Sequence, residues 1–211
     1  NVISFSAAIS ACKKSGQWQN SLVLLEEMDV RGVSPNVVSF SAAISACEKI
    51  GQWQQAIFLL CLMRARCVTP NVKSFSATIS ACARYGQWQY AWSLLQEMRA
   101  EGVTPDIIAV NAVISSCEKS GQWSPSGEQC LAPECESSTQ WRRALALLEE
   151  MCTTGETLST ISFNAAISAC EKSRQWQHAL LLLVKMRAKS IMPSVISYNA
   201  AISACEKCAH W

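Results

Sequence analysis

The 211-residue sequence has few of the features that mark enzymes or membrane proteins. It contains only two histidines, His178 and His210, and it lacks the histidine, glutamate and spaced cysteines of a zinc deaminase. Its aspartates do not cluster as a metal-dependent nuclease requires. The longest unbroken apolar run, 179–184, is far too short to span a bilayer. We therefore expect a protein that is not an enzyme, holds no metal or cofactor, and has no membrane segment.

A pattern with a period of 35 residues runs through the chain. Phe5, Phe40 and Phe75 share this spacing, and the tryptophans and prolines of successive repeats follow it as well. A fixed period in this range is typical of solenoid proteins. We expect one elongated domain over residues 1–211, and we expect it to belong to a longer array, because the chain starts in register with the pattern and stops within a repeat. The repeats are 2–36, 37–71, 72–106, 107–159, 160–194 and the partial repeat 195–211.

Each repeat is predicted to form two helices. In the second repeat, apolar residues from Phe40 to Cys47 recur at i, i+3, i+4 and i+7, which indicates one buried helical stripe. Gly51 follows as a helix end, and a second stripe runs from Ala56 to Met63. A hairpin of this size cannot bury both stripes alone, so its neighbours must cover it. The sequence predicts an all-α fold of stacked helix-turn-helix repeats.

The charge and the cysteines are interpreted against this pattern. The net charge of +2 is only mildly basic, so the distribution of the charges matters more than their sum. Twelve cysteines would suit a disulfide framework, but half of them recur on the apolar stripe, where cysteine behaves as a small hydrophobic residue. We therefore expect free thiols and a reducing compartment. The cysteines of this column are Cys12, Cys47, Cys82, Cys117, Cys170 and Cys205.

The fourth repeat carries 18 extra residues, 124–141, and their removal restores the period. The segment contains prolines and a glycine and has no apolar stripe, so we predict an inserted surface loop between the two helices. A retained non-coding segment of an imperfect gene model explains the insertion equally well. Its Cys130 and Cys135 lack the partners of a metal site or a redox motif. Cys205, Cys208 and His210 likewise lack a fourth metal ligand.

One face of each first helix repeats residues that packing does not require. The fifth residue of every repeat is serine or asparagine, and a cation follows eight residues later. Cations spaced by one repeat suit the phosphates of an extended single strand. The second residue is apolar in all repeats but one, and such residues would form walls of slots for unstacked bases. These second residues are Ile3, Val38, Lys73, Ile108, Ile161 and Ile196, and the cations are Lys14, Lys49, Arg84, Lys119, Lys172 and Lys207. The alternative is that the second residues pack at the helix start and that the charges form a solvated face.

The sequence resembles the pentatricopeptide repeat family. The resemblance rests on the period, on first helices such as SFSAAISACEK and SYNAAISACEK, on the LLEEM second helices, and on the GVSPN and GVTPD links. It covers every residue except the 18 extra ones. It implies a right-handed α–α superhelical solenoid that binds single-stranded RNA and acts in the processing, stability, editing or translation of transcripts in a plastid or mitochondrion.

In that family each repeat reads one RNA base through its fifth and its last residue, while the second residue sandwiches the base. The family's code further implies an RNA site A-A-G-pyrimidine-pyrimidine, written 5′ to 3′ from the amino terminus. Asn199 has no last-residue partner within the chain. The implied base-reading pairs are Ser6 with Asn36, Ser41 with Asn71, Ser76 with Asp106, Asn111 with Ser159, and Asn164 with Ser194.

Two alternatives stay open on the sequence. A protein-binding scaffold of the tetratricopeptide kind would share the paired stripes, although the period, the link proline and the polar fifth column speak against it. The tryptophan at each turn could stack on bases, but a position between the two helices favours covering their apolar stripes. These tryptophans are Trp18, Trp53, Trp88, Trp123, Trp141, Trp176 and Trp211. The sequence names no protein partner.

Overall fold

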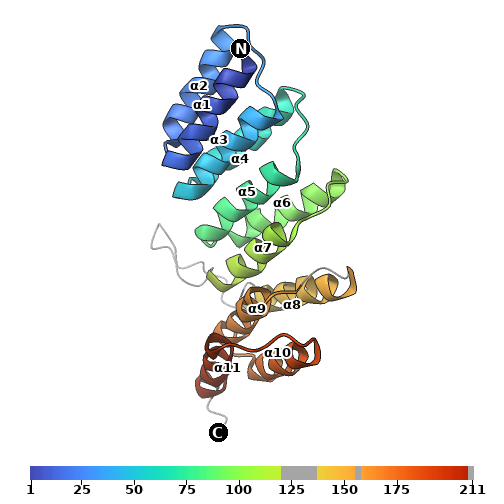
Figure 1. Ribbon diagram of the computed structural model, residues 1–211. Coiled ribbons are helices and arrows are strands. Elements are labelled where there is room, and N and C mark those ends of the chain that lie inside the picture. Colours follow the sequence, from blue (N-terminus) through green and yellow to red (C-terminus); the bar gives the residue numbers. More distant parts are fainter. Residues whose placement is uncertain (120–136, 155–157, 209–211) are drawn as a thin grey trace. The chain divides into compact units, whose positions relative to one another are not determined.

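The computed structural model describes residues 1–119, 137–154 and 158–208, and its regular structure in these ranges is entirely helical (Figure 1). The all-α prediction is therefore confirmed for this part of the chain. None of the described helices is long and apolar enough to cross a membrane. The helices are α1 (Val2–Ser15), α2 (Trp18–Val30), α3 (Val37–Ile50), α4 (Trp53–Ala65), α5 (Val72–Arg84), α6 (Trp88–Ala100), α7 (Ile107–Lys119), α8 (Ser137–Thr154), α9 (Thr160–Lys172), α10 (Trp176–Ala188) and α11 (Val195–Lys207).

The last residue of each repeat determines where the next helix begins. The side-chain oxygen of Asn36 accepts a hydrogen bond from the Ser39 amide at 3.0 Å, and Asn71 accepts one from the Ser74 amide at 2.9 Å. Ser159 and Ser194 cap α9 and α11 in the same way. Asparagine and serine suit this position because their oxygen satisfies an amide that has no partner within the helix.

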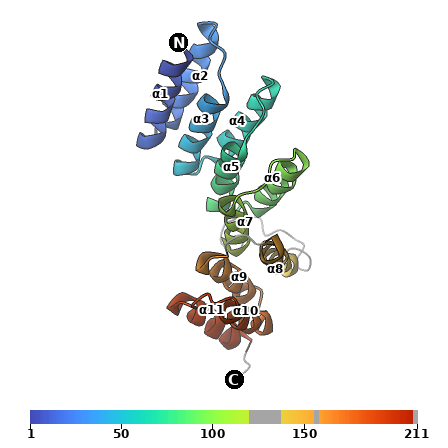
Figure 2. The ribbon, with the colours of Figure 1, turned by 45° about the vertical axis from the view of Figure 1, so that its right-hand side comes forward.

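The chain divides into two compact units, unit 1 (Asn1–Ala109) and unit 2 (Val110–Trp211). In unit 1, α1, α3 and α5 pack side by side, and each hairpin adds its second helix, α2, α4 or α6, behind that row (Figures 1 and 2). Phe40 and Ile44 of α3 and Leu59 and Met63 of α4 are almost fully buried. The apolar stripes predicted for the second repeat therefore face each other.

Unit 2 repeats this construction with its own residues. Helix α9 packs against α8, α10 and α11, and α10 packs against α11. Phe163 and Ile167 of α9 and Leu182 and Met186 of α10 are almost fully buried. These residues occupy the columns of Phe40, Ile44, Leu59 and Met63 in unit 1, so the two units share one hairpin design.

Four of the six cysteines of the column lie in the core, as the sequence predicts, whereas Cys12 and Cys205 of the first and last repeats are half-buried. Burial raises the pKa of the Cys47 and Cys117 thiols to about 11 and that of the Cys82 and Cys170 thiols to about 12. A thiol whose pKa lies this far above neutral pH is poorly reactive, because the thiolate is the nucleophile. The column is structural in both units.

The turn tryptophans Trp53, Trp88 and Trp141 pack rather than project. Trp88 is buried, and the Trp53 ring lies 5.1 Å from the Tyr90 ring of the next hairpin. In unit 2, buried Trp141 lies 4.5 Å from the His178 ring. Each of these contacts joins neighbouring second helices, which supports the packing interpretation for these side chains.

The insertion differs in part from its prediction. Residues 137–141, the last five of the predicted loop 124–141, belong to α8. Pro133 is the last helix-breaking residue of the segment, and no proline or glycine separates it from Trp141. The helix can therefore start before the tryptophan instead of at it. Trp123, Cys130, Cys135, His210 and Trp211 lie outside the described residues, and the single continuous domain over 1–211 stays a prediction.

Candidate nucleic-acid interface

In unit 1, two predicted base-reading pairs meet directly. The Ser41 hydroxyl donates to Asn71 Oδ1 at 3.4 Å, and the Ser76 hydroxyl donates to Asp106 Oδ1 at 2.7 Å. Both serines are buried, whereas Asn71 and Asp106 are half-buried. The fifth residue of these repeats thus forms the floor of a site, and the last residue reaches its opening.

The asparagines of unit 2 are held through an additional serine. Asn111 Oδ1 accepts a hydrogen bond from Ser162 Oγ at 2.6 Å, and Asn164 Oδ1 accepts one from Ser197 Oγ at 2.5 Å. The Asn164 amide also donates to Ser194 Oγ at 3.3 Å. Ser162 and Ser197 are the third residues of their repeats and are fully buried.

In the first repeat, which belongs to unit 1, the fifth residue also contacts a third-residue serine. Ser6 Oγ lies 2.9 Å from Ser39 Oγ, the third residue of the following repeat. This column was not among the residues predicted from the sequence, although its signal is plain: the third residue is serine in every repeat but the fourth, which has Ala109. In these three repeats a third-residue serine links the fifth residue of one repeat to the first helix of the next.

Helix capping controls which atoms of the last residue remain available. Asn71 Oδ1 accepts from both the Ser74 amide and the Ser41 hydroxyl, and Asp106 Oδ1 accepts from both the Ala109 amide and the Ser76 hydroxyl. The Asn71 side-chain amide nitrogen and the second Asp106 carboxylate oxygen have no hydrogen-bond partner among the described residues. One repeat therefore offers a free donor, and the next offers a free acceptor.

The second-residue column is solvent-exposed. Packing at the helix start would bury these side chains, so their exposure argues against that alternative. Lys73, the polar exception, is exposed as well. The exposed fractions are 78% for Ile3, 58% for Val38, 59% for Ile108, 67% for Ile161 and 65% for Ile196.

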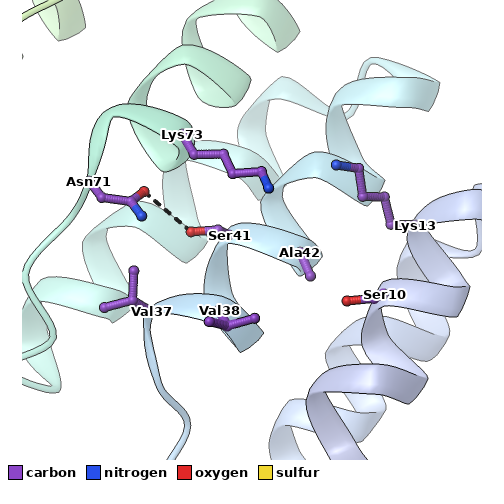
Figure 3. A pocket seen from close by; sticks show the side chains of 8 residues that line it. All are labelled: Ser10, Lys13, Val37, Val38, Ser41, Ala42, Asn71 and Lys73. Atoms are coloured by element: carbon purple, nitrogen blue, oxygen red, sulfur yellow. Dashed lines mark hydrogen bonds between the residues drawn. The ribbon is translucent and has the colours of Figure 1, made fainter. Parts of the chain in front are cut away.

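One slot forms a cavity of about 240 Å³ in unit 1 (Figure 3). The hydrogen-bonded pair Ser41 and Asn71 lines it, together with the second residues Val38 and Lys73. The structure thus brings together the fifth, last and second residues that the sequence assigned to one base.

Helix α1 adds two residues to this cavity, Ser10 and Lys13, neither of which was predicted from the sequence. They follow Ser6 by four and seven residues and hence share its helix face. A serine stands at the position of Ser10 in every repeat, so this column was also visible in the sequence.

The predicted phosphate-contacting cations are exposed where they are described, namely Lys14, Lys49, Arg84, Lys172 and Lys207, while the side chain of Lys119 lies outside the described part. Two of them also contact the preceding repeat. Lys49 Nζ donates to the Lys14 carbonyl oxygen at 3.1 Å, and Lys207 Nζ lies 2.8 Å from Glu171 Oε1. Cations at a helix C-terminus are favoured by its dipole, so these residues also stabilise the stack.

One carboxylate lies among the cations of unit 1. Burial raises the pKa of the Glu48 carboxyl, and the charges of Arg84, Lys13 and Lys49 partly oppose that shift. This acid therefore interacts with three cations at once. Across the described ranges, no group of three histidine, cysteine, aspartate or glutamate side chains is placed to hold a metal ion.

Two family models match the chain. The model of the PPR repeat family matches residues 1–49 and 158–207, and the model described as pentatricopeptide repeat-containing protein matches residues 31–126. No curated protein matches the sequence significantly.

Solved structures show the same architecture. The pentatricopeptide repeat protein PPR10 from maize is 23% identical with a TM-score of 0.69, and the match covers 100% of this chain and 28% of that one. The chain thus spans less than a third of PPR10. The PPR domain of Arabidopsis thaliana protein-only RNase P 1, solved with tRNA, is 12% identical with a TM-score of 0.75, covering 97% of this chain and 98% of that domain. These similarities confirm the α–α superhelical solenoid fold.

Proposed function

Because this chain is a pentatricopeptide repeat protein, we propose that it binds single-stranded RNA, with one base in the slot of each repeat. The observation that carries the proposal is the arrangement of exposed second residues beside a buried, hydrogen-bonding fifth residue and a partly exposed last residue. Proteins read unstacked bases with stacking side chains at the faces and polar groups at the edge. The cavity at Ser41 and Asn71 presents both kinds of group.

The base preference of each repeat follows from the side-chain atoms of its last residue that are not used in helix capping. The free carboxylate oxygen of Asp106 accepts hydrogen bonds, and the Watson–Crick edge of guanine donates from two nitrogens. The free amide nitrogen of Asn71 donates, and the corresponding edge of adenine has a ring nitrogen that accepts. The second repeat therefore suits adenine and the third guanine. Asn36 is the capping residue of the same kind in the first repeat, which assigns adenine there too.

The repeats of unit 2 are less selective. The oxygens of Asn111 and Asn164 are engaged by Ser162 and Ser197, so each asparagine has amide hydrogens left to offer a base, although Asn164 already donates one to Ser194 Oγ. An amide donor fits the carbonyl oxygens that both pyrimidines carry. The proposed RNA site is A-A-G-pyrimidine-pyrimidine, 5′ to 3′ from the amino terminus, with the discrimination concentrated in unit 1.

The biological role rests on what related proteins bind. PPR10 has been solved with an 18-nt psaJ RNA element, and protein-only RNase P 1 with tRNA. We place this chain among RNA-binding modules that guide the processing, stability, editing or translation of transcripts in a plastid or mitochondrion. The chain itself contributes recognition and no catalytic step.

Reciprocal exchange of the last residues tests the proposal. Asp106→Asn should move the preference for the third base from guanine to adenine, and Asn71→Asp should move the second from adenine to guanine. Both exchanges keep the capping oxygen, so the fold should be unaffected. We expect about tenfold changes in Kd, within the roughly 1–3 kcal/mol of a base-specific contact. Fluorescence anisotropy with labelled oligoribonucleotides that carry each base at each position measures them.

Each exchange serves as the control for the other, because Asp106→Asn must leave the second base unaffected and Asn71→Asp the third. Equal affinity for all bases in the wild-type protein and both variants would reject the register.

The protein-scaffold alternative is tested by affinity purification with and without ribonuclease. Specific protein partners that persist after complete RNA digestion, together with no RNA binding by the purified chain, would favour the scaffold.

A further inference from the structure

Two lysines from different helices line the slot of the second repeat. Lys13 comes from α1 and Lys73 from α5, and the two ends of these side chains point toward each other across the slot, above Ser41 (Figure 3). No carboxylate lines this cavity. Neither lysine forms a salt bridge with a described residue. The remaining polar groups of the lining are the hydroxyls of Ser10 and Ser41 and the amide of Asn71. The Ser41 hydroxyl already donates to Asn71 Oδ1, so the Ser10 hydroxyl and the Asn71 amide nitrogen are the groups left to donate hydrogen bonds.

Both lysines depart from the pattern of their columns. Lys73 stands where the other repeats have an apolar second residue. Lys13 stands where the other repeats have glutamate or, once, alanine. The two departures occur in the first and third repeats but come together at one cavity, the slot of the repeat between them. No other repeat has a cation in either column, so the second slot has a charge that no other slot shares.

The surroundings compensate this charge only in part. Glu48 is the carboxyl that interacts electrostatically with Lys13, and it interacts with Lys49 and Arg84 as well. Two ammonium groups that face one cavity repel each other, and an anion between them removes that cost. Hydroxyl and amide donors beside them add directed hydrogen bonds to the oxygens of such an anion.

We infer that Lys13 and Lys73 bind one RNA phosphate beside the base held by Ser41 and Asn71, which makes the second slot the electrostatic anchor of the array. This inference rests on the proposed RNA binding and adds a phosphate site at a particular repeat. A phosphate of the strand itself is the anion most readily supplied there, because it is covalently attached to the bound base. Lys73 then acts as a phosphate ligand rather than as the sandwich residue of its repeat.

The test uses the residues that the chain itself places in these columns. Lys13→Ala copies Ala83, and Lys73→Ile copies the isoleucine of four other repeats. The double variant should bind an oligoribonucleotide containing A-A-G-C-C about tenfold more weakly at low salt, as expected for the loss of charged hydrogen bonds. The slope of log Kd against log salt should fall by about 0.7, the value for one phosphate on a single strand.

Lys189→Glu is the matched control. It lowers the net charge of the protein by two, as the double variant does. The change is at an exposed lysine of unit 2 that does not line the cavity, so the slope should stay within error of wild type. A second control comes from the RNA. A neutral methylphosphonate at the linkage next to the second base should weaken binding by the wild-type protein and have no effect on the double variant. The same change at a distant linkage should weaken both proteins equally.

The outcomes separate the two proposals. If the double variant keeps the wild-type slope while Asp106→Asn still changes the preference at the third base, the phosphate site is wrong and RNA reading stands. Equal sensitivity of wild type and double variant to the methylphosphonate would also overturn the site. If the wild-type chain binds no single-stranded RNA, both proposals fail. A reduced slope together with a lost methylphosphonate effect establishes the site.

Discussion

Unit 1 and unit 2 form the same helical hairpin, but the residues that line their slots differ. In unit 1, Ser76 bonds directly to the last residue Asp106, and two lysines face one slot without a salt bridge. In unit 2, Asn164 is held by Ser197, and Lys207 pairs with Glu171. The buried residues that pack the hairpins occupy the same repeat positions in both units, whereas the residues that line the slots differ. Residues of the slots can therefore vary between repeats without altering the packing of the helices that carry them.

The largest expected effect tests the packing that the two units share. Phe40→Ala in unit 1 and Phe163→Ala in unit 2 remove fully enclosed rings from the same column, and each should lower the free energy of unfolding by about 3–5 kcal/mol. Urea titrations followed by circular dichroism measure both. A loss well below 1 kcal/mol for either variant would show that the two hairpins are not packed alike.

A second pair of variants tests the turn between α3 and α4, with the link that follows α6 as its comparison. Gly51 has a φ of 74°, and a Cβ there would lie 1.9 Å from the Tyr85 ring. Gly102 has a φ of 73° with no atom within 4 Å of a Cβ. Gly102→Ala should cost about 1 kcal/mol through backbone strain alone, whereas Gly51→Ala should cost roughly 2 kcal/mol or more because the ring must also move. Thermal melts of both variants give the difference, and equal costs would argue against the contact with Tyr85.

Unit 2 solves the same turn with a different pair. Arg174 has a φ of 56°, and its carbonyl oxygen accepts a hydrogen bond from the Cys208 thiol, which stands in the column of Tyr85. A smaller partner thus faces a larger turn residue. Arg174→Gly removes the strain of a side chain in the left-handed region and should stabilise the protein by about 1 kcal/mol. An unchanged or lowered melting temperature would contradict this expectation.

The smallest effect concerns the cation of the partial repeat. Glu171→Gln breaks the ion pair with Lys207, which is half exposed, so we expect a loss of only about 0.5 kcal/mol. The freed ammonium should make RNA binding more salt-dependent, by up to about 0.7 in the slope. Titrations at several salt concentrations measure it. An unchanged slope would show that Lys207 acts only between repeats, and not on the strand.

Much of this molecule was predictable from spacing alone. The period of 35 residues and the helical stripes identify the hairpins, the buried cysteine column and the face that carries Ser41. Asn71 was assigned to the same base as Ser41 because of the family resemblance, and the structure brings the two side chains into contact. The start of α8 was missed because the residues before Trp141 have no apolar stripe to reveal a helix.

The sequence by itself determined which residues share a helix face, because helical geometry depends only on local spacing. Only the tertiary structure decided which of those faces meet. Ser162 bonds to Asn111 across 51 residues, and Lys13 joins Lys73 at one cavity across 60 positions of chain. Such partnerships depend on how neighbouring hairpins stack, which no local pattern encodes. The hairpin is thus a property of the repeat, and the binding slot is a property of two or three adjacent repeats together.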